Sequence, residues 1–220
     1  MKRITFITTG QPSTNPRLVK EVDTLMELGY TVNVVYCFYQ SWASKFDSYY
    51  IEKNPSVFHV CGGNPIDERA KFLKTKIRFK LSNYLFRIIK KTNFAENAIS
   101  RTHNDALKLA KKLKADIYIA HNLGALPAAV LAATYLNAKV GYDAEDMHSG
   151  QFTDKSNSGY LLNRHIEKKY FPKIDYFTAA SPLIAKKYKS IYPFLSPVIL
   201  NNVFPAEIIN LNLEIKPVLR

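Results

Sequence analysis

The stretch from Asp116 to Gly150, DIYIAHNLGALPAAVLAATYLNAKVGYDAEDMHSG, decides the fold of this chain. Its first residues, 116–120, form a short apolar run that is typical of a strand buried on both faces of a parallel sheet. The Ala-rich segment 126–136 favours a helix, and Pro127 is tolerated there because it falls in the first turn. Residues 139–143 return as a second strand. The stretch therefore predicts strand, helix, strand and loop, in that order.

Polar and ionisable side chains follow both of these strands. His121 comes directly after the first strand, while Asp143, Glu145 and His148 gather at the end of the second. Ligands of open α/β sheets bind just beyond the carboxyl ends of the parallel strands. We therefore expect a functional site at this edge of the sheet.

The alternation of strands and helices continues on both sides of this stretch. Further strands are predicted at 3–9, 31–38, 57–61, 175–179 and 198–200, and further helices at 16–29, 68–91, 94–113, 160–171 and 182–192. Residues 39–55 are aromatic and irregular, and we expect a loop there. Repeated β-α-β alternation predicts an α/β, doubly wound, mostly parallel Rossmann-like sheet with helices on both faces.

The composition is ordinary for a soluble globular protein except for its charge. Hydrophobic residues make up 47% and charged residues 22%, but the net charge is +13. Such an excess favours an anionic partner, whether nucleic acid, anionic lipid or a phosphorylated substrate. No segment resembles a signal peptide or reaches the roughly 18 apolar residues of a membrane span. Cys37 and Cys61 lack metal-type spacing, so we expect reduced thiols in a cytoplasmic protein.

Several motifs that would assign a function are absent from the sequence. It contains no G-x-G-x-x-G, no G-x-x-x-x-G-K-[ST], no C-x-x-C and no G-x-S-x-G. These absences disfavour a dehydrogenase, a P-loop enzyme, a zinc site and an α/β-hydrolase.

Each residue near the expected site has a functional and a structural interpretation. Gly10 could let the backbone approach a phosphate, or it could be a plain turn glycine. His121 could bind a sugar hydroxyl or stabilise a leaving phosphate, or it could cap the next helix. Arg17 could meet an anionic acceptor, or it could be a surface arginine. Asn15 can cap a helix that has Pro16 at its first position.

The cluster of Asp143, Glu145 and His148 has the same two interpretations. Carboxylates at strand ends suit hydroxyl-rich ligands, and one of them could serve as a general base if its pKa is raised. The alternative is a solvated loop that supplies its own caps.

A basic segment lies between Arg69 and Lys91, where nine Lys and Arg residues occur without a single acid. Apolar residues recur within it at helical spacing, which is typical of a helix lying on an anionic membrane. The alternative is an amphipathic core helix with a solvated basic face, and no recognised nucleic-acid motif accompanies the charge. The residues expected to contact the membrane are Lys74, Arg78, Arg87, Lys90 and Lys91.

The order and spacing of five segments resemble the N-terminal, acceptor-side domain of family-4 glycosyltransferases, whose two-domain architecture is called GT-B. The similar segments are ITFITTGQPSTNPRLVKEVDTLMELGYTVNVV, DIYIAHNLGALPAAVLAA, VGYDAEDMHSG, YFPKIDYFTAASPLIAKKYKSIY and VILNNVF. Glu145 and Asp146 stand where many family members have His and Glu, and the first loop departs from the Gly-Gly version common in the family.

The resemblance implies retaining sugar transfer from a nucleotide-sugar donor, without a metal or another cofactor. It implies that His121 contacts the donor sugar as the catalytic residue and that Gly10 approaches the donor diphosphate. The acceptor pocket would be bordered by Asn15, Arg17, Asp143, Glu145 and His148. Residues 1–204 would be the N-terminal domain, and residues 205–220 would begin a linker to an absent C-terminal domain that binds most of the nucleotide. We therefore expect the chain alone to be inactive.

The leading expectation is one half of a sugar transferase at the inner face of the cell membrane, acting in polysaccharide or glycolipid synthesis on a carbohydrate or lipid-linked acceptor, with no nucleic acid as partner. A non-catalytic α/β module that binds a membrane surface or a partner is the alternative. A nucleotide-sugar epimerase of the same architecture is a third possibility, and it would need no acceptor.

Overall fold

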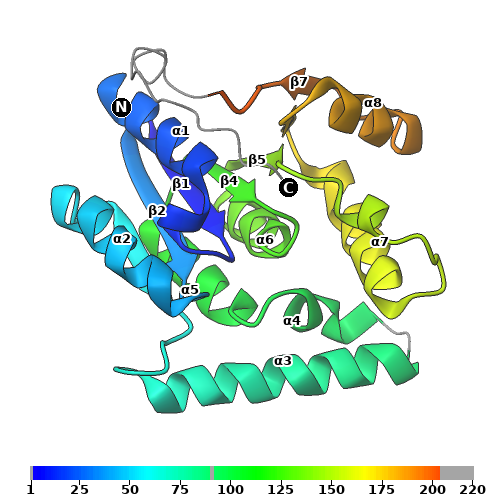
Figure 1. The fold of residues 1–220 in the computed structure, drawn as a ribbon. Helices are drawn as coiled ribbons and strands as arrows, with labels where there is room; N and C mark the ends of the chain where they lie inside the picture. The colour runs from blue at the N-terminus through cyan, green and yellow to red at the C-terminus, as the bar shows by residue number, and fades with distance from the viewer. Residues whose placement is uncertain (1, 90–91, 204–220) are drawn as a thin grey trace, which may run out of the picture.

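A seven-stranded parallel sheet runs through the centre of the computed structural model, which describes residues 2–89 and 92–203 (Figure 1). The strands are β1 (Arg3–Thr8), β2 (Thr31–Cys37), β3 (Phe58–Cys61), β4 (Ile117–His121), β5 (Lys139–Ala144), β6 (Tyr176–Ala179) and β7 (Pro197–Ile199). Their order across the sheet is β3-β2-β1-β4-β5-β6-β7. This order changes direction between β1 and β4, the kind of position at which doubly wound sheets bind ligands. The predicted α/β fold is confirmed.

Helices cover both faces of this sheet. They are α1 (Pro16–Glu27), α2 (Ser41–Lys53), α3 (Arg69–Ile89), α4 (Ala95–Ile99), α5 (His103–Leu113), α6 (Leu126–Leu136), α7 (Ser158–Tyr170) and α8 (Pro182–Ile191), with short 3-10 turns η1 (Pro12–Thr14), η2 (Thr92–Phe94), η3 (His148–Gln151) and η4 (Phe171–Lys173). Asn15 caps α1 as predicted, because its Oδ1 accepts a hydrogen bond from the Leu18 amide at 3.0 Å.

The core lies in two layers because successive strand residues point to opposite faces of a sheet. On one face, Phe6 of β1 and Val34 of β2 pack with Leu18 and Val22 of α1. On the other face lies a larger cluster that includes buried residues of α5, α6, α7 and α8. The cysteines are free and buried, and Cys37 and Cys61 are register partners at the ends of β2 and β3.

The prediction of a loop at 39–55 was wrong, because the structure forms α2 there. Only two of its side chains are buried, and one of them is polar. The Asp47 carboxylate accepts hydrogen bonds from Gln11 Nε2 at 2.6 Å and from the Ser13 amide at 2.8 Å. Because polar contacts hold this helix in place, it lacks the apolar periodicity by which a helix is recognised in a sequence.

The single helix predicted at 94–113 is divided into η2, α4 and α5. Ser100 and Thr102 are buried at the break between α4 and α5. Arg101, between them, donates to the Gly62 carbonyl at 2.6 Å. This long-range bond holds the residues of the break against the loop that follows β3.

The basic helix α3 lies apart from the sheet, at the bottom of Figure 1, and packs against α4. Within residues 2–89 and 92–203, no helix is long and apolar enough to cross a membrane. Lys90, Lys91 and the expected linker at 205–220 lie outside the described residues.

Candidate functional site

Five charged side chains meet beneath the carboxyl edge of the sheet, and we call them the ion-pair network. Its members come from α1, β4 and β5 and the turn after β5; they are Arg17, Glu21, His121, Asp143 and Glu145. Two cations thus face three carboxylates in a largely buried space.

His121 is the last residue of β4, and none of its side chain is exposed. Its Nδ1 lies 3.0 Å from Glu145 Oε1, and its Nε2 lies 3.2 Å from Glu21 Oε2. Burial alone would lower the pKa of His121, but the hydrogen bonds to Glu145 and Glu21 outweigh burial and raise it to about 9. Because both ring nitrogens face carboxylates, the residue is an imidazolium at neutral pH.

Arg17 and Asp143 form the other half of the network. The Arg17 side chain donates from Nε to Asp143 Oδ2 at 2.5 Å and from Nη2 to Oδ1 at 2.8 Å. Such a two-pronged pair is the strongest common geometry for these groups. Thr178 Oγ1 donates to Asp143 Oδ1, and Arg17 Nη1 donates to the Leu200 carbonyl. The pair is almost fully buried, with Arg17 6% and Asp143 1% exposed.

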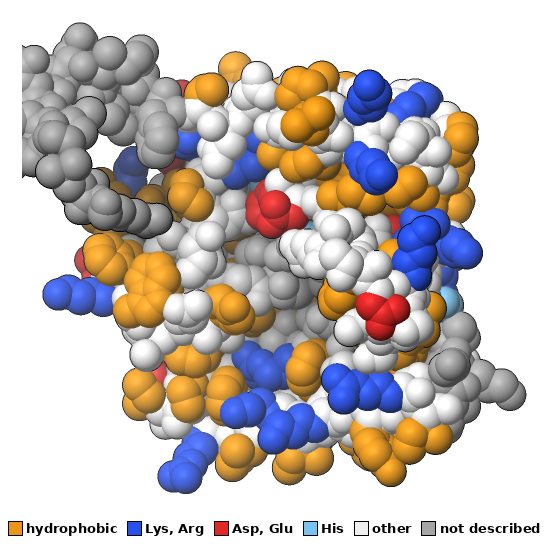
Figure 2. Space-filling model, turned by 45° about the vertical axis from the view of Figure 1, so that its right-hand side comes forward, with side chains coloured by type: hydrophobic (Ala, Val, Ile, Leu, Met, Phe, Trp, Pro, Cys, Tyr) orange, Lys and Arg blue, Asp and Glu red, His pale blue; other side chains and the backbone are white. Residues whose placement is uncertain are grey.

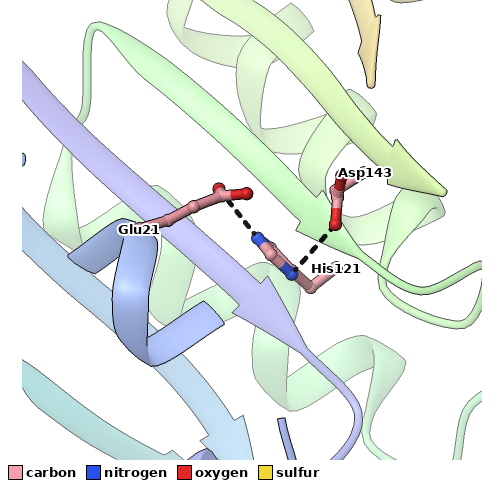
Figure 3. Close-up of side chains that lie close together, drawn as sticks. All are labelled: Glu21, His121 and Asp143. Carbon is pink, nitrogen blue, oxygen red and sulfur yellow. Dashed lines mark hydrogen bonds and ion pairs between the residues drawn. The ribbon is translucent and has the colours of Figure 1, made fainter. Parts of the chain in front are cut away.

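Glu21, His121 and Asp143 each offer an atom of a metal-binding type, and these atoms lie within 4.8 Å of one another (Figure 3). The ring of His121 stands between the two carboxylates, with one nitrogen toward each. However, Arg17 already holds both oxygens of Asp143, and a protonated imidazole cannot ligate a metal. We therefore interpret the three side chains as part of the ion-pair network.

A cavity of about 390 Å³, which we call the site cavity, opens at the carboxyl ends of β1 and β4. Its walls come from the loops after β1 and β4, from η3 and from neighbouring helices. Its lining includes Thr9, Gly10, Asn122, Gly124, His148 and Asn163. Figure 2 shows the right-hand side of the molecule turned forward, hollowed near its middle, with Lys and Arg side chains gathered below the hollow.

Gly10 lies in the wall of the site cavity, as expected for a residue that approaches a ligand. A Cβ at this position would lie 3.0 Å from Thr14 Oγ1, closer than most real Cβ contacts. The absence of a side chain therefore keeps the loop after β1 tight against η1 and leaves backbone facing the cavity.

Asn122 fixes the floor of the site cavity and has a left-handed backbone, with φ 76°. Its Oδ1 accepts from Thr9 Oγ1 at 2.9 Å and from the Ala125 amide at 3.2 Å, and its Nδ2 donates to Thr8 Oγ1 at 3.3 Å. The side chain thereby joins the end of β1 to the start of α6. Asparagine tolerates this conformation better than other residues that carry a side chain.

His148, the first residue of η3, is partly buried in the opposite wall. Its Nε2 accepts a hydrogen bond from the Leu123 amide at 3.3 Å, and its carbonyl accepts from Asn163 Nδ2 at 3.0 Å. Burial lowers the pKa of His148. The ring is therefore neutral at pH 7, with Nε2 engaged as an acceptor and Nδ1 carrying the proton.

The expected site residues thus divide into two groups. Gly10 and His148 line the site cavity. Arg17, His121, Asp143 and Glu145 instead belong to the ion-pair network, and Asn15 Nδ2 donates to Glu145. Only Glu21 and Glu145 of the network are appreciably exposed, at 25% and 29% of their side chains.

Sequence reasoning missed Glu21, Asn122 and Thr178. Glu21 lies one turn after Arg17 on α1, and this spacing of opposite charges on one helix face could have signalled it. Asn122 follows directly after β4, where ligand-binding residues concentrate. No local pattern indicates Thr178, which meets Asp143 because β5 and β6 pair in register.

Comparison with known proteins shows similarity at the level of the fold. No family model matches the chain, and no curated protein sequence matches it. The structure resembles UGT89C1 of Arabidopsis thaliana complexed with UDP-L-rhamnose, with a TM-score of 0.53, 12% identity and coverage of 93% of this chain and 53% of that one. It also resembles the lipopolysaccharide outer core galactosyltransferase WaaB, with a TM-score of 0.50, 12% identity and coverage of 92% and 46%.

The chain therefore spans about half the length of the structures it resembles. At such identities the likeness concerns the fold alone. The chain has the Rossmann-like fold of one half of a GT-B glycosyltransferase.

Proposed function

We propose that this chain is the N-terminal, acceptor-binding half of a nucleotide-sugar-dependent glycosyltransferase of the family-4 type. The observation that carries the proposal is the site cavity, which opens where the strand order changes direction between β1 and β4. Its wall combines backbone at Gly10 with a neutral imidazole at His148, and such groups suit a sugar and its phosphates.

In this proposal, transfer proceeds with retention of the anomeric configuration and without a metal. The main barrier-lowering contribution is electrostatic stabilisation of the departing nucleoside diphosphate. The loop at Gly10 approaches the diphosphate, and a second domain supplies most of the nucleotide contacts. His148 and Asn122 hold sugar hydroxyls at the acceptor side.

His121 is assigned a role at the donor sugar, and this role requires a local rearrangement. Both of its nitrogens face carboxylates, and it has no exposed surface. Glu145 and Glu21 are the partly exposed members of the network, so one of them must swing aside before the ring can reach a ligand. Until then, the imidazolium holds the two carboxylates and the ends of β4 and β5 in place.

The first test replaces His148 by alanine in the complete protein that contains this chain. We expect the rate of sugar transfer to fall at least about tenfold, because a positioned imidazole that hydrogen-bonds or exchanges a proton contributes this much or more. The measurement is nucleotide release with donor and acceptor present, combined with the free energy of unfolding.

The matched control is His59→Ala in β3. His59 is also partly buried and hydrogen-bonds through its side chain to Asn33 at 2.9 Å, but it does not line the site cavity. Its transfer rate should equal that of the wild type. Equal rates in the His148→Ala variant and the wild type would remove His148 from the site.

We further propose that α3 docks this half on the inner face of the cell membrane, which fits a glycolipid or lipid-linked acceptor. The helix has two apolar faces. Phe72, Phe79 and Phe86 lie at seven-residue spacing and are partly or fully buried. A second stripe, 46–66% exposed, points to solvent and consists of Leu73, Ile77, Leu81, Tyr84 and Ile88.

Basic residues flank this exposed stripe. Lys74 and Arg87 are exposed, while Arg78 is half-buried and pairs with Asp105 at 3.3 Å, so it faces the protein. An exposed apolar stripe beside cations fits an interfacial helix, whose apolar side chains enter the headgroup region while lysines contact anionic lipids.

Co-sedimentation with vesicles tests the docking. We expect binding to vesicles that contain anionic lipid, and binding should weaken as salt screens the charges. The Ile77→Asp/Leu81→Asp variant should lose binding, whereas Leu28→Asp at the C-cap of α1, another exposed leucine outside the stripe, should retain it. Equal binding by the stripe variant and the wild type would contradict the proposal.

A further inference from the structure

A second cavity, of about 450 Å³, lies between α3 and the carboxyl ends of β1 and β2. We call it the aromatic–basic cavity after the side chains that set its character, which are Tyr39, Phe72, Phe79, Lys76, Lys80 and Arg101. It shares Thr9, Tyr39 and Ile99 with the site cavity. The two cavities therefore adjoin, and the second extends from the site toward the membrane helix.

The aromatic–basic cavity carries positive charge without a matching negative charge. Three cations and no acid line it. Within the described residues, neither Lys76 nor Lys80 nor Arg101 forms an ion pair with a carboxylate. Lys76 and Lys80 are one helical turn apart on α3, so both can reach the same ligand group.

Arg101 is half-buried and bonds only to neutral acceptors. Its Nη1 donates to the Gly62 carbonyl and to Thr75 Oγ1, both at 2.6 Å, and its Nη2 donates to the Phe38 carbonyl at 3.1 Å. Burial lowers the pKa of this guanidinium, as expected for a charge that is poorly compensated. The protein thus holds a fixed positive group at the cavity wall, where an anion would compensate it.

The aromatic ring of Phe72 contacts two of these cations, Lys76 and Arg101, and the aromatic side chains also give the cavity an apolar surface. The Arg101 guanidinium lies 4.6 Å from the centre of the Phe72 ring, and Lys76 Nζ lies 5.3 Å from the same centre. Contacts of this kind orient cations without neutralising them. The rings of Phe72 and Phe79 leave hydrocarbon surface beside the charges.

We propose that the aromatic–basic cavity binds the phosphoryl group of a lipid phosphate, with the first part of its hydrocarbon chain against the phenylalanines. The occupant's role as the glycosyl acceptor rests on the proposed function, but its binding does not. Cations recognise the phosphoryl group, and the exposed stripe of α3 places the cavity beside the bilayer from which a lipid phosphate would enter. A free phosphate would not use the aromatic walls.

Calorimetric titration with geranyl phosphate, geraniol and inorganic phosphate tests this site. Geranyl phosphate should bind more tightly than either of the other two probes. The Lys76→Ala/Lys80→Ala variant should bind it roughly tenfold more weakly, because hydrogen bonds to charged groups are lost. The control Lys108→Ala/Lys112→Ala removes the same charge from two exposed positions one helical turn apart on α5, outside the cavity, and should bind like the wild type.

Four results would overturn the inference. Wild-type affinity in the Lys76→Ala/Lys80→Ala variant would exclude the cavity, as would equal weakening in the control. If inorganic phosphate bound as tightly as geranyl phosphate, the cavity would be a site for a free anion and not for a lipid phosphate. Displacement of geranyl phosphate by UDP would assign the cavity to the donor instead.

The titration requires neither donor nor turnover, so its failure is separable from failure of the proposed function. If geranyl phosphate binds as expected while no sugar transfer is found, the transferase proposal fails and the lipid-phosphate site stands. If transfer is found but geranyl phosphate does not bind, the acceptor is held elsewhere.

Discussion

Replacing Arg17 by methionine should lower the free energy of unfolding by about 3–5 kcal/mol, as measured for other buried ion pairs that lose one partner. The Asp143 carboxylate would remain buried with only Thr178 and His121 as partners. Methionine fills much of the volume of arginine, so the loss reports an uncompensated charge more than a void. Chemical denaturation gives the value directly.

Two comparisons make this result specific. Arg3→Met breaks an ion pair with Asp116 that is exposed on both sides, and it should cost far less because solvent screens that pair. The double variant Arg17→Met/Asp143→Leu should recover part of the lost stability, since it removes both charges together. If Arg17→Met cost no more than Arg3→Met, the ion-pair network would not be the buried unit described above.

His121→Gln should remove a pH dependence of stability that the wild type shows. The folded-state pKa of His121 is about 9, above the value of about 6.5 expected in the unfolded chain. The contribution of His121 to the free energy of unfolding is therefore fully present below about pH 6.5 and is lost as the pH rises through about 9. The loss is roughly 3 kcal/mol at most. The free energy of unfolding, measured from pH 6 to 10, should fall in the wild type and stay flatter in the variant.

The other histidines do not obscure this window. Burial lowers the pKa of each of them, and for His103 the value is about 4. They therefore titrate below the range in which His121 does, and His59→Gln should keep the wild-type slope. A wild-type curve that is flat between pH 7 and 10 would show that His121 is not held as an imidazolium.

Position along the chain predicted the edge of the sheet at which the candidate site residues lie. It did not predict which of them line the site cavity and which form the ion-pair network. The rule that ligands bind beyond parallel strands pointed to Gly10 and His148, and both line the site cavity. It also pointed to Asp143 and His121, which the structure buries against Arg17 and Glu21. A sequence shows that charges converge but not whether they neutralise one another, since that depends on side-chain geometry between distant elements.

The basic helix shows a similar limit. Its apolar residues fit both a core helix and a membrane helix, and the structure buries one apolar face and leaves another exposed. Phe86 is buried, whereas Ile77 on another face is 66% exposed. Helical periodicity locates apolar stripes, but it cannot tell which stripe the rest of the fold covers. The helix α2 was not predicted because it lacks the apolar periodicity of a core helix. The buried carboxylate of Asp47 anchors it instead.

The arrangement of the two cavities suggests a single route for the acceptor. The exposed stripe of α3 would lie on the bilayer, the aromatic–basic cavity would take the phosphoryl group, and the adjoining site cavity would receive the group to be glycosylated. The two cavities share part of their walls, but the exposed stripe, the pair Lys76 and Lys80, and His148 each belong to one step. Variants at one of these positions should therefore leave the other steps intact.

The most direct test of the central claim measures the consumption of nucleotide sugars by the complete protein that contains this chain, with and without a membrane extract as a source of acceptor. The proposal predicts that one donor is consumed only when acceptor is present, that a nucleoside diphosphate is released, and that the new glycosidic bond retains the donor's anomeric configuration. Interconversion of the sugar without acceptor would indicate an epimerase. If no nucleotide sugar is consumed under either condition, the transferase account is contradicted, and a membrane-surface or partner-binding module becomes the better description.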